Sequence, residues 1–184
     1  MSARYRENQV PSQVGKTAFV TGANTGIGFD TARVLAEKGA RVLLGCRDEQ
    51  RALKAMTAIR ARAPRASLAW VELDLTSLAS IRSASEQVLA EGQLDLLVNN
   101  AGVMVPPKTR TQDGFELQFG VNHLGHFALT GHLLPLLKQQ PDARIVTVSS
   151  LAHRGGKIDF DDLQADRSYS RMKRYQMSKL ANIL

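Results

Sequence analysis

The chain has 184 residues, of which 43% are hydrophobic and 22% are charged; this composition fits one soluble globular domain and excludes a disordered or fibrous chain. The formal net charge of +7 would suit a nucleic-acid partner, but only 5% of residues are aromatic. The basic residues are scattered, apart from a stretch at residues 167–179. We therefore expect a solvated basic surface and no nucleic-acid partner. The single cysteine, Cys46, cannot form an internal disulfide, and no apolar run approaches the ~20 residues that span a bilayer, so we expect a cytoplasmic protein with no integral membrane segment.

Short apolar runs alternate with amphipathic stretches along the whole chain. The runs expected to form strands are Thr17–Val20, Arg41–Cys46, Ser67–Leu73, Leu94–Val98 and Arg144–Val148. The stretches expected to form helices are Gly26–Lys38, Asp48–Arg62, Thr76–Glu91, Asp113–Leu137 and a last one from about Ser168. This alternation predicts an α/β fold, a doubly wound parallel sheet with helices on both faces.

A glycine-rich turn, T-G-A-N-T-G-I-G, follows the first expected strand. Glycines allow a tight turn and a close approach of the backbone to a pyrophosphate, and the next helix directs free N–H groups at that anion. The alternative is a turn that only reverses the chain; the strand before it and the helix after it favour phosphate binding. The residues predicted to bind the cofactor here are Gly22, Asn24, Thr25, Gly26, Ile27 and Gly28.

Further polar motifs follow the later strands in a fixed order. They are Asp74-Leu75, Asn99-Asn100-Ala101-Gly102, Asn122 within a helix, Val148-Ser149-Ser150, and Tyr175-Gln176-Met177-Ser178-Lys179. Over residues 13–184 this order resembles the short-chain dehydrogenase/reductase family, most closely its retinol-dehydrogenase-like and protochlorophyllide-reductase-like branch. The resemblance implies a Rossmann-type sheet with strand order 3-2-1-4-5, a nicotinamide dinucleotide cofactor, and interconversion of a carbonyl and an alcohol by hydride transfer.

The cofactor contacts that the resemblance implies beyond the glycine turn are Asp74 and Leu75 near the adenine, together with Asn100, Ala101, Gly102, Tyr175 and Lys179. From the residues alone, Asp74 fits equally well as a cap for the helix that begins near Thr76. Asn99 and Asn100 would also suit a simple turn. Their place at strand C-terminal ends, where α/β proteins bind ligands, favours the cofactor.

Arg47 predicts which nicotinamide cofactor is used. An NAD site usually has a carboxylate at the end of the second strand, bonded to the ribose 2′-OH. Here that end reads Leu44-Gly45-Cys46-Arg47, with no acid. A guanidinium could grip the 2′-phosphate of NADP(H) with two hydrogen bonds. We therefore expect NADP(H) rather than NAD(H), against the alternative of an ordinary surface arginine.

Two Tyr/Lys pairs have the spacing needed for proton transfer. A tyrosine is a poor acid–base group at neutral pH unless a nearby ammonium favours its phenolate form, and residues i and i+4 share a helix face. Tyr169/Lys173 and Tyr175/Lys179 both have this spacing. Ser178 and the residues that follow match the family only at the second pair, so we predict Tyr175 and Lys179 as the catalytic pair.

The resemblance assigns roles to the remaining catalytic residues. Ser150 would polarise the substrate carbonyl, and Lys179 would bind the nicotinamide ribose and favour the phenolate of Tyr175. Asn122 would hold a water that links Lys179 to solvent. The alternative for Asn122 is a polar side chain satisfied locally within its helix.

Two other features receive no catalytic role. His123 and His126 lie three residues apart, but no H-E-x-x-H pattern or cysteine cluster accompanies them, so we predict no metal site. Cys46 has no partner motif.

The chain ends nine residues after Tyr175, where members of this family continue with two more strands and a substrate-binding segment. We therefore expect residues 1–184 to be a single NADP(H)-binding domain, truncated at its C-terminus, with an exposed sheet edge. The predicted partner is a small carbonyl or alcohol substrate, with homo-oligomerisation an option for the longer chain. The competing hypothesis is a protein on the same fold that binds a dinucleotide without catalysis or serves as a scaffold.

Overall fold

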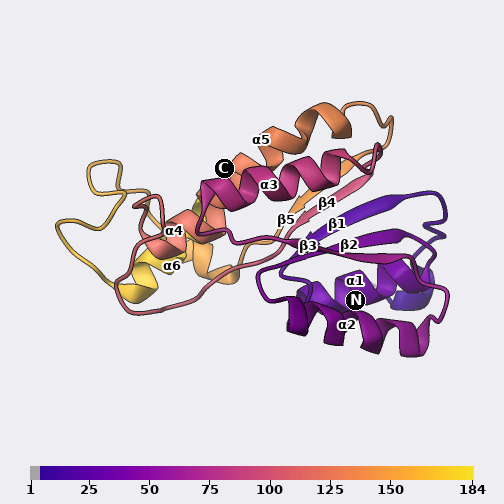
Figure 1. The fold of residues 1–184 in the computed structure, drawn as a ribbon. Coiled ribbons are helices and arrows are strands. Elements are labelled where there is room, and N and C mark those ends of the chain that lie inside the picture. Colours follow the sequence, from indigo (N-terminus) through magenta and orange to yellow (C-terminus); the bar gives the residue numbers. More distant parts are fainter. Residues whose placement is uncertain (1–4) are drawn as a thin grey trace.

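The computed structural model describes residues 5–184, and their five parallel strands form one sheet in the order β3-β2-β1-β4-β5 (Figure 1). The strands are β1 (Thr17–Thr21), β2 (Arg41–Cys46), β3 (Leu68–Glu72), β4 (Leu96–Asn99) and β5 (Arg144–Thr147). The chain passes from the middle of the sheet to one edge, returns, and continues to the other edge. This arrangement confirms the doubly wound fold and the strand order that were predicted.

Two pairs of helices cover the two faces of the sheet (Figure 1). The pair on one face is α1 (Gly26–Glu37) and α2 (Glu49–Arg62), and the pair on the other is α3 (Leu78–Leu89) and α5 (Gly125–Leu137). Successive side chains of a strand point to opposite faces. Ala18 and Val20 therefore pack in the core under α1 and α2, whereas Phe19 packs in the core under α3 and α5. All five residues of β1 are buried, which explains why its three central residues, Ala18, Phe19 and Val20, are all apolar.

The remaining elements lie near or beyond the carboxyl ends of the strands, apart from η1 in the N-terminal segment. They are η1 (Glu7–Gln9), α4 (Leu117–Phe119), the π-helical turn η2 (Gly120–Leu124), η3 (Leu151–Gly155) and α6 (Arg171–Ala181). A small third core of Phe119, Met177 and Ala181 joins α4 to α6. Because α4, η2 and α5 follow one another without a break, the helix that covers the sheet extends directly into this outer cluster.

Several predicted helix boundaries were wrong, and side-chain hydrogen bonds near the observed starts explain why. The helix expected from Asp113 begins at Leu117, because the Asp113 carboxylate accepts the backbone N–H of Leu78, 2.8 Å away on α3. The Glu116 side chain then caps the new start by accepting the N–H groups of Gln118 and Phe119. A contact between residues so far apart in sequence leaves no local signal.

The last helix and the third helix also start later than predicted. Helix α6 begins at Arg171 instead of Ser168, because the backbone carbonyl of Ser168 accepts a hydrogen bond from Arg174. Helix α3 begins at Leu78, and Ser77 is its N-cap, with its hydroxyl accepting the N–H of Ser80 at 3.2 Å. The interpretation of Asp74 as the cap of this helix was therefore wrong.

Strand β5 forms an edge of the sheet, and all four of its residues are exposed. Ile145 and Val146 leave 43% and 49% of their surface accessible. The exposed apolar edge that was predicted is therefore present among the described residues. Within residues 5–184, no helix is long and apolar enough to cross a membrane.

Candidate functional site

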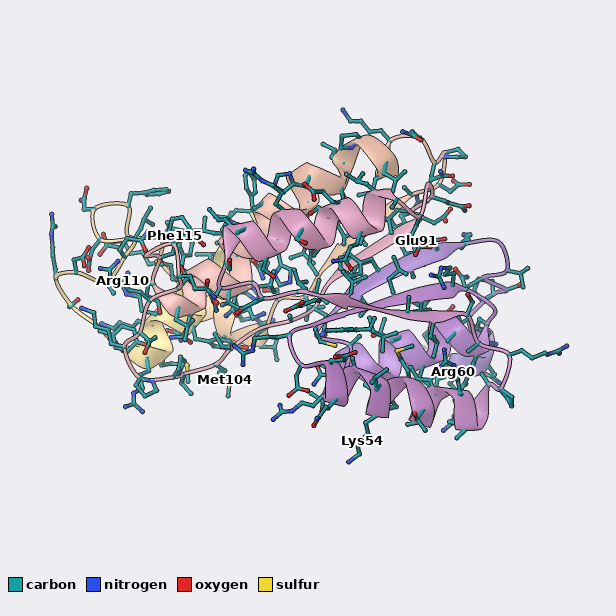
Figure 2. All side chains as sticks on the ribbon, viewed as in Figure 1. Lys54, Arg60, Glu91, Met104, Arg110 and Phe115 are labelled. Atoms are coloured by element: carbon teal, nitrogen blue, oxygen red, sulfur yellow. The ribbon has the colours of Figure 1, made fainter. Side chains whose placement is uncertain are left out.

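The candidate site lies at the carboxyl edge of the sheet, where β1 and β4 end side by side. Figure 2 shows Met104, Arg110 and Phe115 on this side of the molecule, whereas Arg60 and Glu91 lie at the opposite end. Ligands of open α/β sheets bind at the carboxyl edge, beside the point where the strand order reverses. Here the reversal lies between β1 and β4, so the fold and the motifs indicate the same place.

The glycine turn after β1 is shaped for a close approach to a ligand. Gly22 has a φ of +66°, which side chains rarely adopt, and its N–H donates to the Gly45 carbonyl at 2.7 Å. A methyl group at Gly28 would overlap the Gly22 carbonyl and the Asn100 amide. Helix α1 begins directly after Thr25, and the Thr25 side chain does not cap it. The first backbone N–H groups of the helix therefore face the turn without a hydrogen bond from an N-cap side chain. This backbone cradle fits a pyrophosphate.

Hydrogen bonds join the glycine turn to the turn at residues 99–102. The Thr21 hydroxyl accepts the N–H groups of Asn100 and Ala101 at 2.9 and 3.0 Å. The Asn100 side chain donates to the Thr21 carbonyl at 2.8 Å. Asn100 thus holds the two turns together, and its contact with a cofactor stays a prediction.

A cavity of about 210 Å³ lies between the two turns and extends along the end of β2. It is lined by seven of the residues that were predicted to bind the cofactor, namely Gly22, Asn24, Arg47, Asp74, Leu75, Ala101 and Gly102. Thr25 and Gly26 line an adjoining cavity of about 450 Å³. Ile27 is 69% exposed and Gly28 is buried, and neither lines these cavities.

The end of β2 contributes positive charge to the cavity. Arg47 is exposed at its rim, and Arg51, on the first turn of α2, lines both cavities with Asn24. Arg51 was missed from the sequence, although a second arginine in the first turn of the helix after β2 was a usable signal. Asp48 caps this helix by accepting the N–H of Arg51 at 2.9 Å, and its carboxylate lies 3.5 Å from the Arg51 side chain. The Asp48 carboxylate thus keeps the Arg51 side chain at this end of the cavity.

Helix α6 holds the predicted catalytic pair. The ammonium of Lys179 lies 5.9 Å from the centre of the Tyr175 ring. It also donates to the Val148 carbonyl at 3.1 Å, and burial lowers the pKa of Lys179. A Cβ atom built on Gly102 would be only 3.6 Å from this ammonium, so Lys179 lies beside one of the residues that line the 210 Å³ cavity.

The alternative pair does not share a helix. Tyr169 precedes α6, and its hydroxyl donates to the Pro106 carbonyl at 2.8 Å, while Lys173 is exposed on the helix. The i to i+4 geometry therefore applies only to Tyr175 and Lys179.

Two serines follow β5 with different contacts. The Ser149 hydroxyl donates to the backbone carbonyl of Lys179 at 2.6 Å, which joins the end of β5 to α6. The Ser150 hydroxyl accepts the N–H of Ala152 at 3.2 Å and caps η3. An accepted bond leaves the hydroxyl hydrogen of Ser150 for another partner. This difference agrees with the choice of Ser150 rather than Ser149.

Asn122 lies in the π-helical turn η2 and is completely buried. Its side chain pairs with both backbone groups of Val103, accepting at 2.8 Å and donating at 3.0 Å, and donates to the Ser178 hydroxyl at 2.9 Å. The alternative of local satisfaction within the helix was wrong, because all of these partners lie elsewhere. The water-holding role stays a prediction, and one acceptor position of the amide oxygen is left for it.

The two histidines near Asn122 make hydrogen bonds inside the protein. His123 contacts the Asn182 side chain at 3.2 Å and stacks on Phe119. His126 contacts Thr21 and the backbone of Asn122. Among residues 5–184, no group of three or more metal-ligating side chains is assembled.

The sequence profile of the short chain dehydrogenase family matches residues 16–160, and the chain belongs to this family. Human retinol dehydrogenase 12 is 52% identical over 171 residues, which cover 92% of this chain and 54% of the relative. This agrees with the predicted retinol-dehydrogenase-like branch. The chain spans about half the length of the curated relatives it matches.

Solved structures have the same fold. The crystal structure of an uncharacterised protein from Mycobacterium paratuberculosis is 42% identical, with a TM-score of 0.85 over 97% of this chain and 63% of the other. A metagenomic short-chain oxidoreductase in complex with NADP is 28% identical, with a TM-score of 0.74 over 92% of this chain and 72% of the other.

Proposed function

We propose that residues 1–184 form the NADP(H)-binding and catalytic part of an oxidoreductase that interconverts a carbonyl and an alcohol. The observation that carries the proposal is the position of Lys179 beside Gly102. Gly102 lines the same cavity as Gly22 and Arg47, so the Lys179 ammonium lies beside that cavity. A cofactor lying along this cavity would extend from Arg47 at one end to Lys179 at the other.

A bound nicotinamide ring would supply or accept the hydride. In the reducing direction, the Ser150 hydroxyl would donate a hydrogen bond to the substrate oxygen, and Tyr175 would give its phenolic proton to the alkoxide that forms. The Lys179 ammonium would then stabilise the phenolate left behind, because opposite charges attract strongly in a partly dry site. In the oxidising direction the same groups act in reverse order.

The preference for NADP(H) rests on charge at the end of β2. Arg47, Asp48 and Arg51 all line the cavity. The last residue of β2 is Cys46 and not an acid, and the Asp48 carboxylate accepts the backbone N–H of Arg51 as the cap of α2. A guanidinium binds a phosphate with two parallel hydrogen bonds, whereas the 2′-OH of NADH gains little from it. The NADP complex of the metagenomic relative supports this choice.

Fluorescence titration of the chain with NADPH and NADH tests the proposal. We expect Arg47→Asp to weaken NADPH binding by roughly tenfold or more and to change NADH binding by less than about threefold. Arg65→Asp is the matched control, since Arg65 is exposed and lines a cavity at the opposite edge of the sheet. Equal losses for both cofactors in Arg47→Asp would contradict the NADP(H) assignment, and absence of binding by the wild-type chain would contradict the proposed function.

A further inference from the structure

His126 occupies a buried position between the cofactor turns and the catalytic helices. Only 3% of its surface is exposed. One ring nitrogen, Nε2, lies 2.8 Å from the Thr21 hydroxyl oxygen, and the other, Nδ1, lies 3.1 Å from the backbone carbonyl oxygen of Asn122. The histidine therefore touches β1 and the π-helical turn, two segments far apart in the chain.

The hydrogen-bond partners of Thr21 determine which ring nitrogen of His126 carries the proton. The hydroxyl oxygen already accepts two backbone N–H groups, from Asn100 and Ala101, so both of its lone pairs are used. Its one hydrogen must then be donated, either to His126 Nε2 at 2.8 Å or to the Val98 carbonyl at 3.4 Å. The nearer acceptor is the imidazole.

The same reasoning fixes the other ring nitrogen. Because Nε2 accepts the hydroxyl hydrogen of Thr21, it carries no proton, and Nδ1 of the neutral ring must carry one. Nδ1–H then donates to the Asn122 carbonyl, which can only accept. Burial disfavours the doubly protonated ring, and the Lys179 ammonium and His123 act in the same direction.

We propose that His126 is a positioning residue of the cofactor site, which orients the Thr21 hydroxyl so that it accepts the N–H groups of Asn100 and Ala101. The inference rests on the proposed function. The turn fixed in this way carries Gly102, which lies next to Lys179. The second hydrogen bond of the imidazole holds the π-helical turn whose Asn122 side chain pairs with Val103 and Ser178. One neutral ring thus connects the cofactor turn with the catalytic helix.

Three variants separate this role from packing. His126→Phe keeps a ring but removes both hydrogen bonds, Thr21→Val keeps the shape but removes the hydroxyl, and His126→Gln keeps an acceptor for Thr21. His132→Phe is the matched control, because His132 is exposed on the same helix. Each protein is titrated with NADPH and with NADH, and its thermal midpoint is measured alongside.

We expect His126→Phe and Thr21→Val each to weaken binding of both cofactors by roughly three- to tenfold. The double variant should bind no more weakly than the worse single variant, since both remove the same bridge. His126→Gln should recover most of the affinity, and His132→Phe should bind as the wild type does. A lower thermal midpoint with unchanged dissociation constants, or fully additive losses, would show that His126 only fills space.

A second measurement keeps the inference testable if His126→Phe does not fold. Long-range ¹H–¹⁵N spectra of the wild-type chain at pH 7 distinguish the two neutral tautomers of an imidazole. A proton on Nδ1 of His126 supports the inference, and a proton on Nε2 or on both nitrogens overturns it. If the wild-type chain binds neither cofactor, the proposed function fails; if it binds but the variants bind equally well, only the role of His126 fails.

Discussion

The Lys179 ammonium lies 5.9 Å from the centre of the Tyr175 ring, one helical turn along α6. The two side chains therefore lie on the same face of the helix. The ammonium is held there by the Val148 carbonyl at the end of β5, 3.1 Å away. Ser149 joins the same two segments by donating to the backbone of Lys179. The residues after β5 thus fix the position of α6 at Lys179.

This arrangement predicts separate effects of two tyrosine substitutions. Tyr175→Phe removes the proposed proton donor, so NADPH-dependent reduction of a panel of apolar aldehydes should fall by roughly 10²- to 10⁴-fold. NADPH binding should stay within about threefold of wild type, because the ring and Lys179 remain. Tyr169→Phe is the control: its hydroxyl bonds to the Pro106 carbonyl in a loop, so activity should change little. The reverse pattern would assign catalysis to Tyr169.

Gly28 offers a test of the backbone cradle. A methyl group at this position would overlap the Gly22 carbonyl and the Asn100 side chain, so Gly28→Ala should push the two turns apart. We expect loss of measurable NADPH binding in fluorescence titrations and a lower thermal midpoint. Gly131→Ala is the matched control in α5, where no atom lies within 4 Å of the new methyl group. There alanine should leave binding unchanged and raise stability by about 0.5–1 kcal/mol.

The sheet was predictable because each of its parts has a local signal. The centre of β1 is an apolar run, Ala18–Val20, and Gly39 stands just after the end of α1. The glycine turn was also readable, since its three glycines lie within seven residues at the junction of a strand and a helix, although the close contacts with Asn100 and Ala101 were not.

The contacts that complete the site were not readable from the sequence. Thr21 and His126 are 105 positions apart, and Asn122 and Ser178 are 56 apart. The π-helical turn directs the Asn122 side chain to Val103, and no residue pattern in the sequence predicts a π-helical turn at this place. Tertiary packing decides which residues form such pairs. A local sequence pattern can therefore identify the residues but not their hydrogen-bond partners.

Stability should fall as the solution is acidified, and His126 is the main cause between pH 6.5 and 4. Burial lowers the pKa of His126 from 6.5 to about 4. Between these pH values the unfolded chain binds a proton at this histidine and the folded chain does not. The free energy of unfolding therefore falls by on the order of 3 kcal/mol as the pH falls through this range. Above pH 6.5 the contribution is fully present. Urea unfolding at a series of pH values measures it.

His126→Gln separates this effect from that of the carboxylates. Hydrogen bonds from Arg33 and Arg41 hold the pKa values of Glu7 and Glu91 below 4.5, so their contribution disappears only at lower pH. The variant should therefore lose the change between pH 6.5 and 4 but keep the change below it. An unaltered profile in His126→Gln would refute the assignment.

The ion pair of Arg174 and Asp162 should control the loop that carries residues 156–170. Both side chains are buried, with Arg174 Nη2 2.7 Å from the Asp162 carboxylate. Arg174 also donates to the backbone carbonyls of Asp162 and Ser168, while the carboxylate accepts three backbone N–H groups of the same loop. Arg174→Met would keep an unbranched stem but remove the guanidinium, which leaves the Asp162 carboxylate buried without its cation and is costly.

We expect Arg174→Met to lower the thermal midpoint by several degrees and to make residues 156–170 the first site of proteolytic cleavage. Arg171→Met is the control, since Arg171 is exposed three residues earlier on α6. NADPH binding should change little in both variants, because neither arginine lines the cofactor cavity. Limited proteolysis with cleavage sites read by mass spectrometry decides the matter. If both variants are cut at the same rate and place as the wild type, the ion pair does not hold the loop.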